Sequence, residues 1–220
     1  MLASLLLCLA LAQNSDAQAA PSDAPPQPAT PAAKSGVVRK PASRSEAAWT
    51  LDYEAGPVRL YRDPSTGEAY WYATFTIVNR SGKDRHIAPR WELMDEQGRL
   101  CGEGRAVPSD VTKSILRLLH DPQLQESSAV VGDIAQGTEN GKPGLVVFPA
   151  GPEVRRFSLF VSGISSDRDS IKDPKTGKPV VVQKTLRLDY QVPGERKGLK
   201  GAVPLAEPES GTSNPSWIYR

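Results

Sequence analysis

The sequence predicts a mainly β protein, an immunoglobulin-like antiparallel β-sandwich with one short crossover helix. Two stretches, 71–77 and 157–163, alternate apolar and polar residues with the period of a half-buried strand. The 20 prolines and 18 glycines in 220 residues fit many short strands joined by tight turns. A single stretch has apolar residues at helical spacing. The number of strands and the one helix favour two sheets over a closed barrel, although the cysteine-tryptophan-cysteine signature of true immunoglobulin domains is missing.

The overall composition restricts the class of partner. A hydrophobic fraction of 39% suffices for one core and is too low for a membrane protein, so no transmembrane segment is expected in the mature chain. The 27 basic and 25 acidic residues leave a formal charge of +2, which gives no overall field to attract nucleic acid. We therefore expect no nucleic-acid partner.

Residues 1–19 are predicted to be a signal peptide. The apolar run 2–12 has the length of an export-signal core, and 17–19 form a small-x-small cleavage site before Ala20. The first four residues lack the usual Lys or Arg, which a misplaced start codon would explain. Two alternatives are a short buried helix and a lipid anchor on Cys8, and the leucines just before Cys8 disfavour the anchor. The mature chain is thus expected to be exported, to the periplasm or outside the cell.

Three further segments follow the predicted signal peptide. Residues 20–46 are rich in proline and alanine and predict a disordered linker. Residues 47–195 form the predicted β-sandwich domain, and 196–220 a mostly disordered tail whose last residues are apolar enough to dock on this domain or on a partner. Cys101 is the only cysteine of the mature chain, so no internal disulfide is expected, and its side chain is either a small buried apolar group or a free thiol.

The domain begins with strands at 48–53 and 58–61. An Asp-Pro-x-Thr-Gly turn at 63–67, repeated at 173–177, predicts two hairpins, because Asp-Pro opens a type I turn and the glycine adopts a positive φ. The stretch 70–100 is interpreted as a core-forming hairpin of two long antiparallel strands.

The second half of the domain contains the predicted helix and two more strands. Ser109 or Asp110 can cap the helix and Asp121-Pro122 ends it, so that it is either a sheet-to-sheet crossover or a cover over an open end. A continuously apolar strand follows at 145–148. The side chains of Phe157, Leu159 and Val161 are expected to pack opposite those of Trp71, Phe75 and Ile77.

Three segments, 72–100 with its T-F-T-I-V-N-R-S-G-K-D turn, 156–166 and 184–195, resemble uncharacterised exported β-sandwich proteins of planctomycete-type bacteria. The resemblance covers about residues 48–195. It implies an exported β-sandwich and supplies no catalytic or binding residues.

The motifs of catalysis and of cofactor binding are missing, so we expect no enzyme, no cofactor and no metal. Neither His86 nor His120 has a partner at metal-ligand spacing or an obvious orienting carboxylate, and no G-x-S-x-G occurs. The stretch 137–142, with glycines at 137 and 141 and a lysine at its end, lacks the spacing of a phosphate loop and is interpreted as a flexible loop. The acidic stretch 167–173 is either a calcium loop or, given Arg168 and Lys172, a solvated charged loop.

The candidate ligand-binding residues are Arg80, Lys83, Arg85, Arg90 and Tyr72. The four basic residues, with His86, lie at the predicted hairpin tip, and Tyr72 with Tyr70 offers a stacking face if the outer side of the sheet is open. The alternative is a soluble turn whose charges discourage association. We expect a non-enzymatic exported domain that binds or spaces a cell-envelope component, its partner an envelope protein or polysaccharide. The alternatives are a carbohydrate-binding module that uses exposed aromatics and the basic tip, and a hydrolase with an unfamiliar carboxylate site.

Overall fold

A computed structural model describes residues 47–151, 153–194, 199, 201–208 and 210–220. All of them belong to one compact unit, Ser45–Arg220. The predicted signal peptide 1–19, the predicted linker 20–46 and Cys8 lie outside the described residues.

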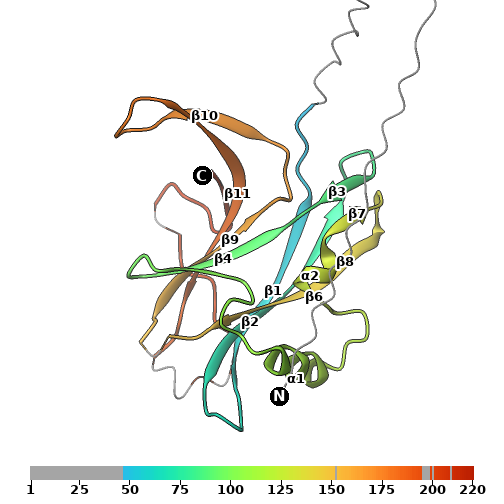
Figure 1. The fold of residues 1–220 in the computed structure, drawn as a ribbon, viewed down its shortest axis with the longest axis vertical. Helices are drawn as coiled ribbons and strands as arrows, with labels where there is room; N and C mark the ends of the chain where they lie inside the picture. Colours follow the sequence, from blue (N-terminus) through green and yellow to red (C-terminus); the bar gives the residue numbers. More distant parts are fainter. Residues whose placement is uncertain (1–46, 152, 195–198, 200, 209) are drawn as a thin grey trace, which may run out of the picture. The chain divides into compact units, whose positions relative to one another are not determined.

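The described chain is mainly β, as predicted, and its strands form two main sheets (Figure 1). One sheet has the order β1-β2-β8-β6, and the other has the order β11-β9-β4-β5, with β10 and β12 also paired to β11. A separate two-stranded ribbon joins β3 and β7. The elements are β1 (Asp52–Arg62), β2 (Ala69–Asn79), β3 (Arg85–Ile87), β4 (Arg90–Asp95), β5 (Leu100–Gly102), α1 (Ser109–Leu119), β6 (Gln125–Glu126), α2 (Ser127–Val130), β7 (Gly132–Ile134), β8 (Gly137–Pro149), β9 (Arg156–Ser162), β10 (Arg168–Lys172), β11 (Pro179–Gln191) and β12 (Ser216–Tyr219).

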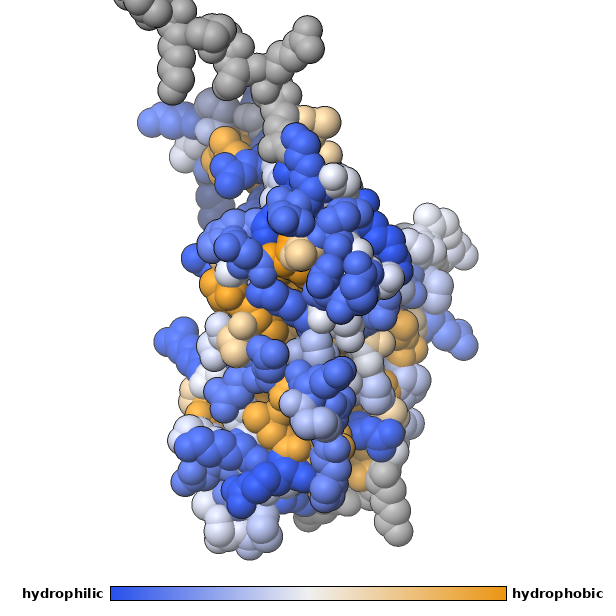
Figure 2. All heavy atoms as spheres, turned by 90° about the vertical axis from the view of Figure 1, so that its right-hand side faces the viewer, coloured by the Kyte–Doolittle hydropathy of each residue, from blue (hydrophilic) through white to orange (hydrophobic). Residues whose placement is uncertain are grey.

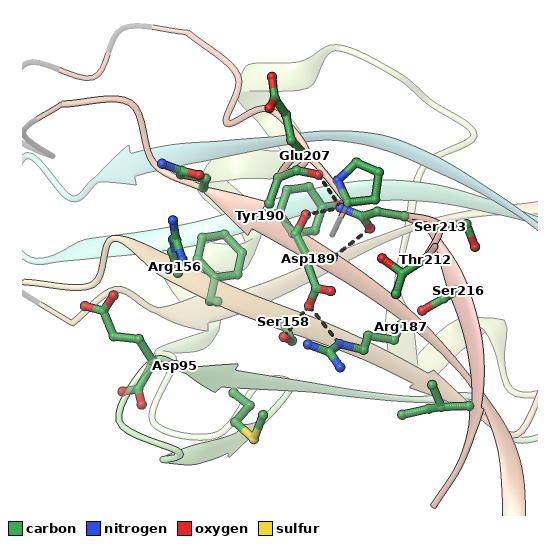
Figure 3. Close-up of a pocket in the computed structure, with 18 of the residues that line it drawn as sticks. Asp95, Arg156, Ser158, Arg187, Asp189, Tyr190, Glu207, Thr212, Ser213 and Ser216 are labelled. Carbon is green, nitrogen blue, oxygen red and sulfur yellow. Dashed lines mark hydrogen bonds and ion pairs between the residues drawn. The ribbon is translucent and has the colours of Figure 1, made fainter. Parts of the chain in front are cut away.

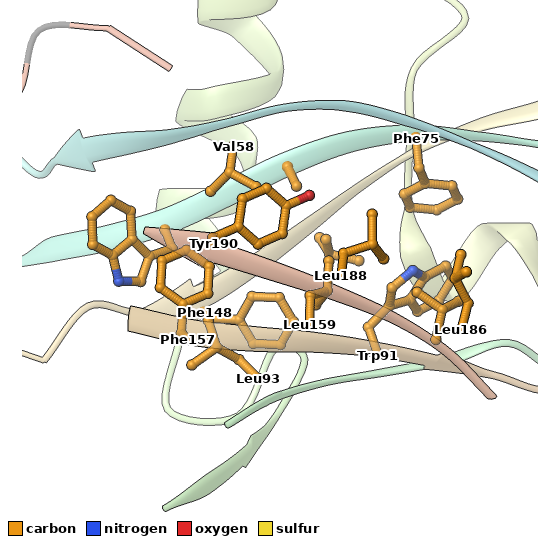
Figure 4. Close-up of a cluster of buried hydrophobic side chains, with 14 of the residues drawn as sticks. Val58, Phe75, Trp91, Leu93, Phe148, Phe157, Leu159, Leu186, Leu188 and Tyr190 are labelled. Carbon is orange, nitrogen blue, oxygen red and sulfur yellow. The ribbon is translucent and has the colours of Figure 1, made fainter. Parts of the chain in front are cut away.

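The main core lies between the two sheets (Figure 4). The rings of Trp71 on β2 and Phe157 on β9 are 5.4 Å apart, and those of Phe75 on β2 and Trp91 on β4 are 4.6 Å apart. All four side chains are buried, and burying a side chain of this size contributes roughly 1.5–3 kcal/mol. The prediction that β9 packs opposite β2 is confirmed, and the face-to-face sheets are consistent with a β-sandwich.

The predicted hairpin over 70–100 is wrong. Its two strands, β2 and β4, belong to different sheets: β2 pairs with β1 and β8, while β4 pairs with β5 and β9. An alternating pattern identifies a strand and its buried face, but it does not identify the neighbouring strand. Here the aromatic rings of β2 and β4 meet across the core instead of side by side within a sheet.

The predicted helix is confirmed as α1, in the connection from β5 of one sheet to β6 of the other. It is therefore a crossover element, and it covers the outer face of the first sheet rather than an open end. Val111 and Ile115 of the helix pack on a second apolar cluster that contains Tyr70 and Tyr72 of β2. The predicted caps are wrong, because Pro108 takes the capping position and no side chain bonds there. His120 ends the helix in the left-handed conformation, and its Nδ1 lies 2.9 Å from the carbonyl oxygen of Leu118.

Both Asp-Pro-x-Thr-Gly turns form as predicted, between β1 and β2 and between β10 and β11. The amide of Gly67 donates to the carbonyl of Asp63 over 2.8 Å, and Gly177 donates to Asp173 over the same distance. The two glycines have φ values of +75° and +67°. This positive φ is the reason that the turn sequence ends in glycine.

The tail differs from the disordered segment expected for 196–220. In its described part, β12 pairs with β11, and single bridges join Val203 to Val58 and Leu205 to Tyr190. Without the tail, this edge of β11 would leave a row of backbone N–H and C=O groups unpaired. The predicted docking of the last residues thus takes place on this domain, because they satisfy that edge.

Cys101 lies half-buried on β5 and forms no disulfide. Burial raises the pKa of its thiol. None of the helices in the described ranges is long and apolar enough to cross a membrane.

Candidate functional site

The predicted basic cluster lies in the turn after β2, on β3 and at the start of β4, and Arg80 and Arg85 contact neighbouring side chains. The guanidinium of Arg80 pairs with the carboxylate of Asp52 on β1. That of Arg85 lies over the ring of Trp49, 5.1 Å from its centroid, and donates from Nε to Ser81 over 2.8 Å. Lys83 lies in the turn after β2, and Arg90 begins β4. The contacts of Arg80 and Arg85 thus connect the β2–β3 region to the start of the domain at Trp49 and Asp52.

Tyr72 does not offer the expected stacking face. Its side chain is only 6% exposed because α1 covers the outer side of β2, and this burial raises the pKa of its hydroxyl. Tyr70 lies in the same cluster and donates to Glu68 over 2.7 Å. The face that Figure 2 presents is mostly hydrophilic, with apolar side chains in small separate patches.

His86 has a carboxylate partner that the sequence did not reveal. Its Nδ1 lies 2.7 Å from Oδ1 of Asp133, across the β3–β7 ribbon. The two residues are far apart in sequence, and the short strand β7 has no alternating pattern that would predict it. Both side chains are mostly exposed, so the pair is a surface contact of small energetic weight.

The acidic stretch 167–173 does not form a calcium loop. Asp167 accepts a bond from the hydroxyl of Tyr219 over 2.9 Å and lies 3.6 Å from the ammonium of Lys184, while Asp169 is part of β10. Asp173 belongs to the second turn, where backbone bonds from Lys175 and Thr176 lower the pKa of its carboxyl group. No group of three or more metal-ligating side chains occurs among the residues that the structure describes.

The stretch 137–142 is not the flexible loop predicted for it. It forms the first half of β8, where Gly137 pairs with Asn79 and Lys142 pairs with Ile77 of β2. The rejection of a phosphate loop is unaffected, since this stretch leads into a strand and not into a helix.

The strongest candidate site is a polar groove of about 990 Å³ on the outer face of β4, β9 and β11 (Figure 3). The tail forms its other wall. We call it the outer groove, and its lining includes Met94, Asp95, Glu96, Arg156, Ser158, Arg187, Asp189, Glu207, Thr212, Ser213, Asn214, Ser216 and Ile218.

Asp189 is the centre of the groove floor. Its carboxylate accepts hydrogen bonds from the hydroxyl of Ser158 on β9 and, over 2.8 Å, from Nε of Arg187 on its own strand (Figure 3). Strand geometry brings these groups together, because Ser158 is directly opposite Asp189 and Arg187 is two residues away on the same face. On the groove floor, the negative charge of Asp189 is therefore paired with the positive charge of Arg187.

Asn214 attaches the tail wall to this floor. Its Oδ1 accepts from the amide of Asp189 over 3.0 Å, and its Nδ2 donates to the carbonyl oxygens of Asp189 and Ala206 over 2.8 Å each. The side-chain amide thus acts as a strand partner where β12 no longer reaches.

Two charged side chains that line the groove have no partner among the described residues. Arg156 of β9 and Glu207 of the tail are both exposed, and neither side chain has a hydrogen bond or ion pair with another described residue. They carry opposite charges on opposite walls. Among the residues that the structure describes, the groove thus combines a paired Arg187–Asp189 floor with one cation and one anion that have no side-chain partner.

The groove residues escaped the sequence-based search for a simple reason. The alternation of the strands at 157–163 and 186–190 assigns Arg156, Ser158, Arg187 and Asp189 to polar outward positions, where solvated side chains are the ordinary expectation. Their significance depends on the tail, which covers them and was expected to be disordered.

Comparison of the chain with protein-family models, curated proteins and solved structures gives no match.

Proposed function

We propose that this protein is a non-enzymatic exported domain that binds a cell-envelope component in the outer groove. The observation that carries the proposal is the combination of a preformed polar groove with Arg156 and Glu207, whose side chains have no partner among the described residues. Preformed concave sites with a few convergent polar groups are the usual form of a ligand site. The sequence patterns of 1–19 and 20–46 support the proposal, since they predict an export signal and a linker. The resemblance to exported planctomycete-type proteins points in the same direction.

Binding is a better account of the groove than catalysis. The hydroxyl of Ser158 donates to the groove carboxylate of Asp189, which also accepts from Arg187. A serine nucleophile needs a base that can take its proton, usually a histidine, and both histidines lie elsewhere, on β3 and at the end of α1. The Ser158–Asp189 bond therefore serves to fix the floor.

The ligand that best fits these charges is a polypeptide segment with both acidic and basic side chains. A segment of this kind pairs its carboxylate with Arg156 and its ammonium or guanidinium group with Glu207, while its backbone bonds to the hydroxyls of Ser213 and Ser216. An envelope protein is thus the proposed partner.

A carbohydrate-binding module is the second candidate. The hydroxyl, amide and carboxylate groups of the groove favour it, since they match the hydroxyls of a sugar. The stacking surface is the weaker part of this candidate, because Tyr70 and Tyr72 are buried.

We further propose that the sandwich is of immunoglobulin-like type. The orders β1-β2-β8 and β11-β9-β4-β5 correspond to strands A-B-E and G-F-C-C′ of that fold, and Trp91 on the C-equivalent strand is buried as in antibody domains. The short parallel strand β6 departs from the pattern, because the D strand of that fold is antiparallel to E.

The test is retention of the mature chain, residues 20–220, with envelope extracts and, in parallel, with a panel of polysaccharides. Specific retention of one envelope protein, lost in Arg156→Glu, supports the proposal. Retention on a glycan alone supports the carbohydrate-binding candidate. Equal retention of the Arg156→Glu variant and the unaltered chain on every sample contradicts the groove as the site.

A further inference from the structure

The outer edge of β12 carries backbone groups that no described residue satisfies. Gln183 of β11 and Arg220 exchange both of their N–H···O bonds, over 2.8 and 3.2 Å. In an antiparallel pair such residues alternate with residues whose N–H and C=O groups point away from the partner strand. Trp217 and Tyr219 are therefore the positions at which β12 directs its backbone away from β11.

This edge lacks the features that protect other edges. The four residues of β12 include no charge and no proline, and Trp217 and Tyr219 are 39% and 44% exposed. Strands at the edge of a sheet are normally protected by charge, proline, a bulge or a covering segment. An uncharged aromatic edge is a template for another strand.

We propose that a second copy of this chain pairs with β12, edge to edge and antiparallel, about a two-fold axis at Ile218. This register places Trp217 opposite Tyr219 of the second copy, and each of the two pairs exchanges backbone hydrogen bonds. The two Ile218 side chains meet at the axis on the groove side of the sheet. Aromatic and β-branched pairs opposite one another are the favourable pairs of an antiparallel sheet.

The edge strand β10 shows why the second copy uses β12. A two-fold axis at Ser170 would place Arg168 opposite Lys172 of the other copy, and an axis at Ile171 would place Asp169 opposite Asp173. Both registers bring like charges together, which destabilises a strand pair. Self-pairing through β12 meets no such repulsion.

Pairing at β12 has a consequence for binding. The two-fold axis is perpendicular to the joined sheet, so both outer grooves open on the same side of a continuous sheet. Two grooves on one face engage a repetitive partner with higher effective affinity than either alone. The self-association itself does not depend on the groove having a ligand.

The test measures mass by sedimentation of the whole mature chain over a concentration series. We expect a reversible dimer for the unaltered chain. Ile218→Lys and Ile218→Glu, each alone, should be monomeric because they place like charges at the axis, and an equal mixture of the two should regain the dimer. Ile171→Lys, the same change at a 46% exposed position of β10, is the matched control and should leave the dimer intact.

Three results would overturn the proposal. They are a monomer at every concentration for the unaltered chain, a dimer that persists in Ile218→Lys, and two monomeric Ile218 variants that do not combine when mixed. Tyr219→Pro provides a second route. It removes an N–H that points away from β11, together with the side chain whose hydroxyl bonds to Asp167, and it should also give a monomer.

Discussion

The indole Nε1 of Trp91 donates a hydrogen bond to the hydroxyl of Tyr53 over 3.2 Å. The bond joins β4 of one sheet to β1 of the other within the main core, and Tyr53 also stacks on Phe75 with ring centroids 5.6 Å apart. It is therefore a polar connection between the two sheets in otherwise apolar surroundings.

Tyr53→Phe should destabilise the protein through this bond. The change keeps the ring and leaves the Trp91 N–H without its partner, which costs roughly 1–3 kcal/mol. Chemical denaturation at pH 7 measures the loss. Tyr61→Phe is the matched control, because the Tyr61 hydroxyl has no hydrogen bond within the described chain, and it should change the free energy of unfolding by less than about 0.5 kcal/mol. Equal losses in the two variants would show that the Trp91–Tyr53 bond makes no net contribution to the free energy of unfolding.

Gly163→Ala should be more damaging than Gly67→Ala. Both glycines have a positive φ, +78° and +75°, so each substitution carries the left-handed penalty of roughly 1–2 kcal/mol. A Cβ at Gly163 would also lie 2.2 Å from the carbonyl oxygen of Ala88, whereas a Cβ at Gly67 has nothing within 4 Å. Thermal unfolding of the two variants measures the difference, and similar melting temperatures would argue against the close approach of the two segments.

The stability of the protein should fall between about pH 10 and pH 12, partly through Tyr190. Burial raises the pKa of its hydroxyl from 10.0 to about 12. In that range the unfolded chain loses the proton and the folded chain retains it, so rising pH favours unfolding. One pKa unit corresponds to 1.36 kcal/mol, so Tyr190→Phe should reduce the loss by roughly 2–3 kcal/mol. Denaturant titrations of both chains at pH 9.5 and pH 12 test this, and parallel curves would contradict it.

Asp95 should make the protein sensitive to acid. Burial raises the pKa of this carboxyl group, but bonds from the amides of Arg99 and Gln97 and from the Arg99 guanidinium outweigh burial and bring the pKa below 3.8. Its contribution is present above pH 3.8 and is lost as the pH falls through the lower folded value.

Asp95→Asn should therefore lower stability at pH 7, by up to roughly 3 kcal/mol, and flatten the decline below pH 4. Glu96→Gln, at the neighbouring exposed position, controls for the removal of one negative charge from the same turn. A full acid decline in Asp95→Asn would mean that other groups account for it.

The strands and turns were predictable where local chemistry determines them. The alternation from Trp71 to Ile77 identifies both a strand and its core face. The two turns are recognisable because their positive φ requires a glycine, at Gly67 and Gly177. Pairing between strands was not predictable in the same way. It depends on contacts such as that between Phe75 and Trp91, which are equally compatible with a hairpin or with two facing sheets.

The outer groove could not be predicted from the sequence, for a different reason. Asn214 looks like an ordinary loop residue in the sequence, and its role arises only because its amide meets the edge of β11 at Asp189. Composition predicted disorder for the tail, since it is rich in proline and polar residues. The tail is held to the edge of β11 largely by backbone hydrogen bonds. Such bonds do not depend on residue type, so composition does not predict them.

The most direct test of the account is the affinity of the envelope protein retained by the mature chain for a charge-reversal series. Arg156→Glu should weaken binding at least tenfold, and Arg168→Glu, the same change at an exposed position of β10, should leave binding unchanged. A polypeptide ligand with both charges should also lose affinity for Glu207→Lys. Unchanged affinity in Arg156→Glu and Glu207→Lys would contradict the outer groove as the binding site.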